Sequence, residues 1–353
     1  MSEIDYGKTK AVAIWLYSCA FLIFCIAIVG AITRLTGSGL SITEWQPVTG
    51  ILPPTSPEEW ARVFDLYRET PEYQKINKGM SLDEFKFIFF WEWFHRLLGR
   101  LVGVVYLVPF LAFLAMKRIP RIYLPSFIGF FLLGGAQGFM GWYMVQSGLV
   151  DVPAVSHYRL AAHLSLALLL FGLILHMALR LSLPPAKDRA PLDVLYKPAW
   201  RVMAVLALTI LWGAFVAGSK AGLVYNSFPL MGKYPWPEEL LDMSPLWINF
   251  FENHATVQFI HRLLAFITLV LVLQLVFRAM NFQKAPRIAW AFGCLGFLAI
   301  VQFMLGVVTI VSEVALPPAV LHQAGAMLLL AALIWVLHEL PPSGYSMDKK
   351  EKA

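Results

Sequence analysis

Long apolar runs alternate with short polar stretches along the whole sequence. A helix needs about twenty consecutive apolar residues to cross the hydrocarbon core of a bilayer. Runs of that length occupy residues 12–33, 88–115, 122–146, 157–180, 198–219, 254–280, 287–311 and 319–338. The pattern therefore predicts an all-α integral membrane protein with eight transmembrane helices.

Basic residues gather in alternate loops between these spans. Lysines and arginines lie between spans two and three, four and five, and six and seven, and near both ends of the chain. The other loops, 147–156, 312–318, 34–87 and 220–253, are poor in basic residues or balance them with acids. Since basic loops stay on the cytoplasmic side, both termini are predicted to be cytoplasmic. The N-terminus lacks the character of an organelle transit peptide, so a bacterial inner membrane is the simplest location.

The composition agrees with a membrane protein. Hydrophobic residues make up 59% of the chain and charged residues 14%, which is typical of polytopic proteins. The net charge of +6 is explained by the loop lysines and arginines, so no nucleic-acid partner is expected. Cys19, Cys25 and Cys294 all lie inside apolar runs without metal-ligand spacing, which indicates small core residues.

The first outer loop, residues 34–87, is long. Within it, SPEEWARVFDLYRETPEYQKIN predicts an amphipathic surface helix with Trp60, Phe64 and Tyr67 on one side. Two roles fit this helix equally well, a cap over a site or a plain solvated helix.

Four landmarks recur in the same order in the two halves of the chain. GAITRLTGSGLSITEWQPVTG after span one resembles GAFVAGSKAGLVYNSFPLMG after span five, because in both a glycine precedes a Gly-Leu pair by nine residues. EWFHRLLG in span two matches QFIHRLLA in span six, and PAVSHYRLAAH at span four matches PAVLHQAGA at span eight. Spans three and seven share a glutamine followed by a glycine four residues later. We therefore expect two pseudo-repeated four-helix bundles, residues 1–190 and 191–353.

Histidines lie several residues inside four of the spans. They are His95 in span two, His261 in span six, His322 in span eight, and either His157 or His163 in span four. A lone intramembrane histidine is usually bonded to a neighbouring helix, but four at matched depth and repeat-related places favour metal ligation. Two histidines from facing helices form an axial pair for haem iron, whereas zinc and copper sites draw several ligands from a tight cluster. The sequence predicts one haem site in each half.

Span four leaves a choice of register. The PAVxH match pairs His157 with His322, whereas depth in the membrane favours His163. The two candidates are separated by about 240° around the helix, so they cannot both face one haem. We expect His163 to be the ligand and His157 to be an edge residue near haem propionates or water. Arg96 and Arg262 each follow a ligand candidate and are expected to contact propionates or support the site.

An acid distinguishes the two halves. Glu92 precedes His95 by three residues, whereas Gln258 precedes His261 by three. A carboxylate one turn from a metal ligand can act as an acid or a base, so we expect Glu92 to be catalytic. The alternative is a structural ion pair between Glu92 and Arg96 or Arg100.

Together these motifs resemble the haem A synthase family, which converts haem O to haem A for cytochrome oxidases. The resemblance covers nearly the whole chain. Its most specific parts are GAITRLTGSGLSITEWQPVTGILPP, EWFHRLLGRLVG, GGAQGFMGWYMVQSGL, YRLAAH, FIHRLLA and the pair His322-Gln323. It implies oxidation of a ring methyl of haem O to a formyl group, through two hydroxylations and a geminal diol that loses water.

The resemblance also implies a division of roles between the halves. His95 and His163 would bracket the substrate haem, with Glu92 beside it to position or deprotonate water. His261 and His322 would ligate a resident haem b that passes electrons. Some family members carry a cysteine pair in an outer loop, which this chain lacks, so a thiol-disulfide step is not expected there.

Two other functions compete with this interpretation. A di-haem b-type electron-transfer subunit would need the same histidines but not Glu92. A transporter would need paired broken helices at corresponding places, which the sequence does not suggest. For a haem A synthase, the expected partners are haem O, the haem O synthase, a quinone or other respiratory electron acceptor, and cytochrome oxidase assembly factors. A homo-oligomer is compatible with the sequence.

Overall fold

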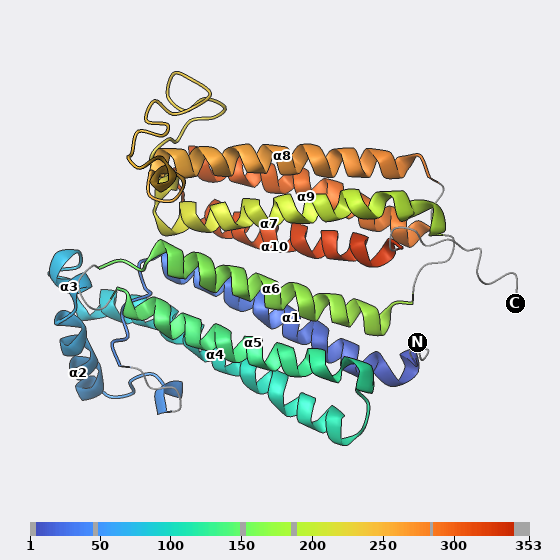
Figure 1. Cartoon of the computed structure of the whole chain (residues 1–353). Coiled ribbons are helices and arrows are strands. Elements are labelled where there is room, and N and C mark those ends of the chain that lie inside the picture. Colours follow the sequence, from blue (N-terminus) through green and yellow to red (C-terminus); the bar gives the residue numbers. More distant parts are fainter. Residues whose placement is uncertain (1–4, 45–48, 149–152, 185–188, 283–284, 342–353) are drawn as a thin grey trace, which may run out of the picture.

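The computed structural model describes residues 5–44, 49–148, 153–184, 189–282 and 285–341. This part of the chain is helical and contains no strands, and eight of its helices are long and apolar enough to cross a membrane. They are α1 (Tyr6–Leu35), α4 (Leu82–Ala115), α5 (Leu124–Gln146), α6 (His157–Ser182), α7 (Tyr196–Gly218), α8 (His254–Met280), α9 (Pro286–Val311) and α10 (Leu316–Glu339) (Figure 1). The predicted fold class and number of spans are confirmed.

Two of these helices begin before the apolar runs that predicted them. α1 begins at Tyr6 because the side chain of Asp5 accepts hydrogen bonds from the first backbone N–H groups of the helix. α4 begins at Leu82 because Ser81 and Glu84 form a capping box. Such caps satisfy the free N–H groups of a first turn. α4 therefore extends beyond its apolar run, and its first turns belong to the long segment that connects the first two spans.

Helices α1 and α6 lie between the α4–α5 pair and the group α7–α10 (Figure 1). α1 packs against α4 and α10, and α6 packs against α5, α7 and α10. Buried apolar side chains such as Leu16, Ile174 and Leu333 form one core that continues across this boundary. Val108 and Leu132, on α4 and α5, are largely exposed, as expected for surfaces that face lipid.

A short helical cap covers the N-terminal extension of α4. It consists of α2 (Pro57–Arg68) and α3 (Pro71–Lys75), so the predicted amphipathic helix is present but is divided in two after Arg68, before Pro71 begins a new helix. Phe64 and Tyr67 are buried, and their rings stack on Phe85 of α4 at centroid distances of 4.8 and 5.1 Å. The ring of Trp60 packs edge-to-face against the ring of Phe89, with the ring centroids 5.1 Å apart. The apolar side of α2 is thus packed against the protein.

The cap also encloses a carboxyl group. Glu72 is only 7% exposed, and its Oε2 accepts a hydrogen bond of 3.0 Å from the hydroxyl of Tyr67. Burial raises the pKa of Glu72 to about 7 against the Tyr67 hydrogen bond, with the negative charge of Glu92 adding to the rise and Lys220 opposing it. The folded cap therefore favours the protonated form of Glu72.

The cap should accordingly loosen as the pH rises. Between the ordinary pKa of a glutamate and about 7 the folded cap binds more protons than the unfolded segment, so its stability falls across that interval. Hydrogen exchange of α2 and α3 amides should be slower at pH 5 than at pH 8, after correction for intrinsic rates. Glu72→Gln should remove the difference. A pH dependence that persists in this variant would assign it to another group.

Candidate functional site

Each of the four deep histidines lies against a glycine of a neighbouring helix. A Cβ atom on the glycine would lie 2.9 Å from Cε1 of the imidazole in three of the pairs and 3.1 Å in the fourth, which is tighter than most real Cβ contacts. The four pairs are Gly30–His95, Gly141–His163, Gly213–His261 and Gly306–His322. The glycines come from α1, α5, α7 and α9, and the histidines from α4, α6, α8 and α10. Small residues let membrane helices approach closely, and here they make room for an imidazole.

These contacts distinguish the two candidates in span four. His163 has the glycine contact that the other deep histidines share. His157 is the first residue of α6, where its backbone packs directly against Gly218 of α7. Its Nε2 lies 3.6 Å from a carboxylate oxygen of Glu252. The structure thus brings His163 into the same arrangement as the other three and leaves His157 at the junction with α7.

In the second half, the two imidazoles face each other. The ring centroids of His261 and His322 are 6.4 Å apart, and the ring planes are inclined by 87°. His261 Nδ1 lies 3.0 Å from the carbonyl oxygen of Thr209. A carbonyl can only accept a hydrogen bond, so Nδ1 carries the proton and Nε2 retains its lone pair. His261 is therefore held in the tautomer that a metal ligand requires.

Two glutamines occupy corresponding places beside the other histidines. The side-chain amide of Gln302 on α9 lies 3.1 Å from His322 Nδ1 and donates to the His322 carbonyl at 2.9 Å. The amide of Gln137 on α5 lies 3.2 Å from His163 Nδ1. The Gln137 amide also lies 3.3 Å from His163 Nε2, so each glutamine contacts an imidazole from the helix that also provides its glycine.

The histidine pairs fit haem better than other metal centres. In the described residues, no group of three or more His, Cys, Asp and Glu side chains is arranged to hold a metal ion. A tight zinc or copper cluster is thus not formed there, whereas haem iron needs only two axial ligands. His261 and His322, whose ring centroids are 6.4 Å apart, are the residues that would hold a haem in the second half.

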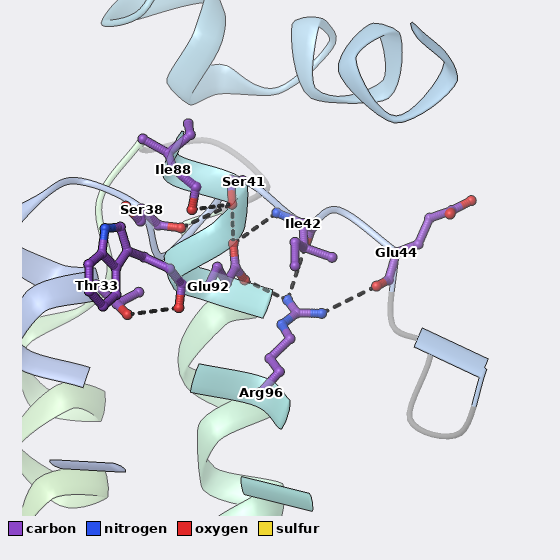
Figure 2. Close-up of polar contacts among 9 residues, drawn as sticks. Thr33, Ser38, Ser41, Ile42, Glu44, Ile88, Glu92 and Arg96 are labelled. Atoms are coloured by element: carbon purple, nitrogen blue, oxygen red, sulfur yellow. Dashed lines mark hydrogen bonds and ion pairs between the residues drawn. The ribbon is translucent and has the colours of Figure 1, made fainter. Parts of the chain in front are cut away.

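Glu92 is the centre of a buried hydrogen-bond network (Figure 2). It is 3% exposed. Its Oε2 accepts hydrogen bonds of 2.8 Å from the hydroxyl of Ser41 and from the backbone N–H of Ile42, and its Oε1 accepts one of 2.7 Å from Arg96. Arg96 also donates to the carbonyls of Ile42 and Glu44. Three donors, one of them a guanidinium, hold the carboxyl group in place.

The second half contains the same clamp without the charge. Gln258 donates to the carbonyl of Tyr225 at 3.0 Å, and Arg262 donates to the carbonyls of Tyr225 and Ser227 at 2.7 and 2.9 Å. Tyr225 follows its Gly-Leu pair at the same spacing at which Ile42 follows the pair in the first half. Glu92 and Gln258 thus both hold the segment that follows the Gly-Leu pair against a membrane helix. The negative charge, the ion pair with Arg96 and the bond from Ser41 are particular to Glu92.

Several residues of the site were not predicted from the sequence. Ser41 and Thr209 contribute through tertiary contacts with residues about fifty positions away, and no local pattern marks them. The glycines are different, because Gly30 and Gly213 are the ones that precede the Gly-Leu pairs in both halves. Their recurrence was visible, although their contact with histidine was not.

The glycine contacts give a direct test. Gly213→Ala should displace the His261 ring and weaken metal binding in the second half, because the added Cβ would lie 2.9 Å from Cε1. The expected result is a fall of about tenfold or more in haem affinity, measured by titrating haem into the purified protein. Gly293→Ala on α9 is the matched control, since nothing lies within 4 Å of its Cβ position. Equal affinities for the two variants would contradict the proposed packing.

The sequence matches one family model over most of its length. Residues 13–334 match the model described as cytochrome oxidase assembly protein (COX15-CtaA). Among similar proteins, one from Rhodospirillum centenum is 50% identical over 334 residues, which cover 94% of this chain and 89% of that one. One from Parvibaculum lavamentivorans is 48% identical and covers 94% of both chains, and one from Nitrosospira multiformis is 47% identical and covers 96% of both. All three are named heme A synthase.

Proposed function

We propose that this chain is a haem A synthase, an oxidoreductase that acts on haem O. The chain belongs to the family of cytochrome oxidase assembly proteins. The observation that carries the proposal is the identity of 50% over 94% of the chain with a relative of that name. The four histidine–glycine contacts agree with it, because they seat two imidazoles in each half that could hold a haem. The eight apolar helices place the enzyme in a membrane.

The reaction converts a ring methyl of haem O to a formyl group. Each of two hydroxylations adds an oxygen atom from water and removes two electrons and two protons. The resulting geminal diol loses water to give the aldehyde of haem A. The electrons pass to a quinone or another respiratory acceptor, and the protons need an acceptor close to the methyl carbon.

We assign the substrate haem to the first half, between His95 and His163. Glu92 lies one turn from His95 and is the only acid of the described clamps, since Gln258 takes the corresponding place. Its carboxylate can hold a water molecule near the substrate and accept a proton from it. The bonds from Ser41, Ile42 and Arg96 hold that carboxylate in place.

We assign a resident haem b to the second half, between His261 and His322. Such a haem supplies a reversible one-electron acceptor. The Thr209 carbonyl fixes the orientation of His261, which favours a permanently bound group. Arg96 and Arg262 hold the outer segments through backbone carbonyls, so we propose that they support the two sites.

The remaining proposals concern location and assembly. The chain is assigned to a bacterial inner membrane with both termini in the cytoplasm and the haem sites toward the outer side. We propose two pseudo-repeated bundles, residues 1–190 and 191–353, because the Gly–His contacts and the clamps recur in both halves. Haem O synthase and cytochrome oxidase assembly factors are the proposed partners. His157, beside Glu252, is proposed to support the junction between the halves.

Haem extraction provides the test of this function. Cells that make haem O, with and without this protein, should be compared by chromatography of their extracted haems. Haem A should form only with the protein. If cells with the protein contain bound haem b but no hydroxylated or formyl haem, the protein is an electron-transfer subunit instead.

A further inference from the structure

Gln323, the residue next to the proposed ligand His322, forms a hydrogen bond to α1, the helix against which the proposed ligand His95 packs. Gln323 follows His322 on α10, and its Nε2 donates to the carbonyl of Ala27 on α1 at 2.7 Å. Ala27 lies one turn before Gly30, the glycine against which His95 packs. One hydrogen bond therefore connects the turn that carries a ligand of the second half with the turn that seats a ligand of the first.

Helix packing alone does not require an amide at this position. An amide buried in apolar surroundings is costly unless it finds a partner, and polar side chains inside membrane helices usually serve a function. The position after His163 in the first half is occupied by Leu164, so an apolar residue is compatible with this type of helix. The Ala27 carbonyl lies within a continuous α-helix, where it already accepts a backbone N–H.

Other hydrogen bonds between the halves lie near the ends of the helices. Arg34 donates to the Ala217 carbonyl at the end of α7, and His338 donates to the Leu183 carbonyl just beyond α6. The Gln323–Ala27 bond lies instead at the depth of the deep histidines. At this position, a change in the separation of α1 and α10 would change the distance between the two proposed haem sites.

We infer that Gln323 is a positioning residue that sets the distance and orientation between the two haem sites. It does so by holding the His322 turn of α10 against the Gly30 turn of α1. This role rests on the proposed function, in which electrons removed from the substrate in the first half pass to the haem of the second. Electron transfer weakens steeply with separation, so a tether at this point sustains the rate of methyl oxidation.

Gln323→Met is the appropriate variant because methionine has similar length and volume but no N–H donor. His338→Leu is the control, since it removes a hydrogen bond between the halves far from the histidines. Three quantities should be measured: haem b bound per chain, the iron–iron distance distribution by pulsed EPR with haem b and haem O bound, and the ratio of haem A to hydroxylated haem.

Gln323→Met should keep its haem b, shift or broaden the iron–iron distribution, and lower the ratio of haem A to hydroxylated haem by about 10–100-fold, as small misplacements do. His338→Leu should match the wild type in all three. The inference is overturned if Gln323→Met leaves the distribution unchanged, if both variants change equally, or if Gln323→Met loses haem b. A wild type that makes no haem A would refute the proposed function, whereas the distance measurement would still decide the role of Gln323.

Discussion

Replacement of Glu92 with glutamine is expected to leave both haem sites loaded and to abolish haem A formation. Glutamine has the shape of glutamate, and Gln258 shows that an amide can hold the equivalent outer segment. At position 92 the amide has one acceptor oxygen, so it retains either the bonds from Ser41 and Ile42 or the bond from Arg96, and it loses the charge. General-base catalysis contributes about 10²–10⁴-fold to a rate, so the yield of haem A per bound haem O should fall by that order. Extraction and chromatography of haems from the purified variant would measure it.

Ser41→Ala separates the clamp from the charge. It removes one hydrogen bond to Glu92 Oε2 but leaves the bonds from Ile42 and Arg96 and the negative charge. We expect it to loosen the outer segment, seen as faster hydrogen exchange, with a far smaller loss of haem A than Glu92→Gln. If Glu92→Gln makes haem A at the wild-type rate, Glu92 is not the base and serves only the clamp.

Loss of a second-half histidine should have the largest spectral effect. His261→Ala or His322→Ala removes one of two facing imidazoles whose rings are 6.4 Å apart. Changes to residues that merely support a metal ligand cost about 10–100-fold in affinity, so loss of the ligand itself should cost more. The protein purified from cells without haem O should then lack the absorption bands of low-spin haem b.

The first-half histidines provide the comparison. His95→Ala and His163→Ala should keep the haem b bands under the same conditions, because their imidazoles belong to the other site. They should fail to bind added haem O and should make no haem A. A loss of haem b bands in all four variants would contradict the assignment of the resident haem to the second half alone. The bands could also be lost in His157→Ala but kept in His163→Ala. His157 would then contribute to the resident haem site, and His163 would still be assigned to the substrate site.

The number of spans and the fold class could be predicted because the length of an apolar run sets whether a helix crosses the bilayer. The ends of the helices were less accessible. α1 and α4 begin at caps made by Asp5 and by Ser81 with Glu84, which lie outside the apolar runs. Hydropathy does not register a hydrogen bond between a side chain and a first turn.

The histidines could be found from the sequence, but their surroundings could not. Depth in the membrane favoured His163 over His157, which the repeat match paired with His322, and the contact of His163 with Gly141 arises only when α5 packs on α6. The sequence likewise offered two roles for Glu92, as a catalyst or as a structural ion pair. The structure contains the ion pair with Arg96, together with bonds to Ser41 and Ile42 that no spacing rule predicts.

The two clamps differ by very little at the level of the gene. Codons for glutamate and glutamine differ only in their first base, so a single base change can exchange the residues found at positions 92 and 258. Glu92 accepts a hydrogen bond from the backbone N–H of Ile42, whereas Gln258 donates one to the backbone carbonyl of Tyr225, so the exchange also requires a different backbone group to face the side chain. A duplicated haem-binding unit could in this way gain or lose a reactive carboxylate without rebuilding the helices around it.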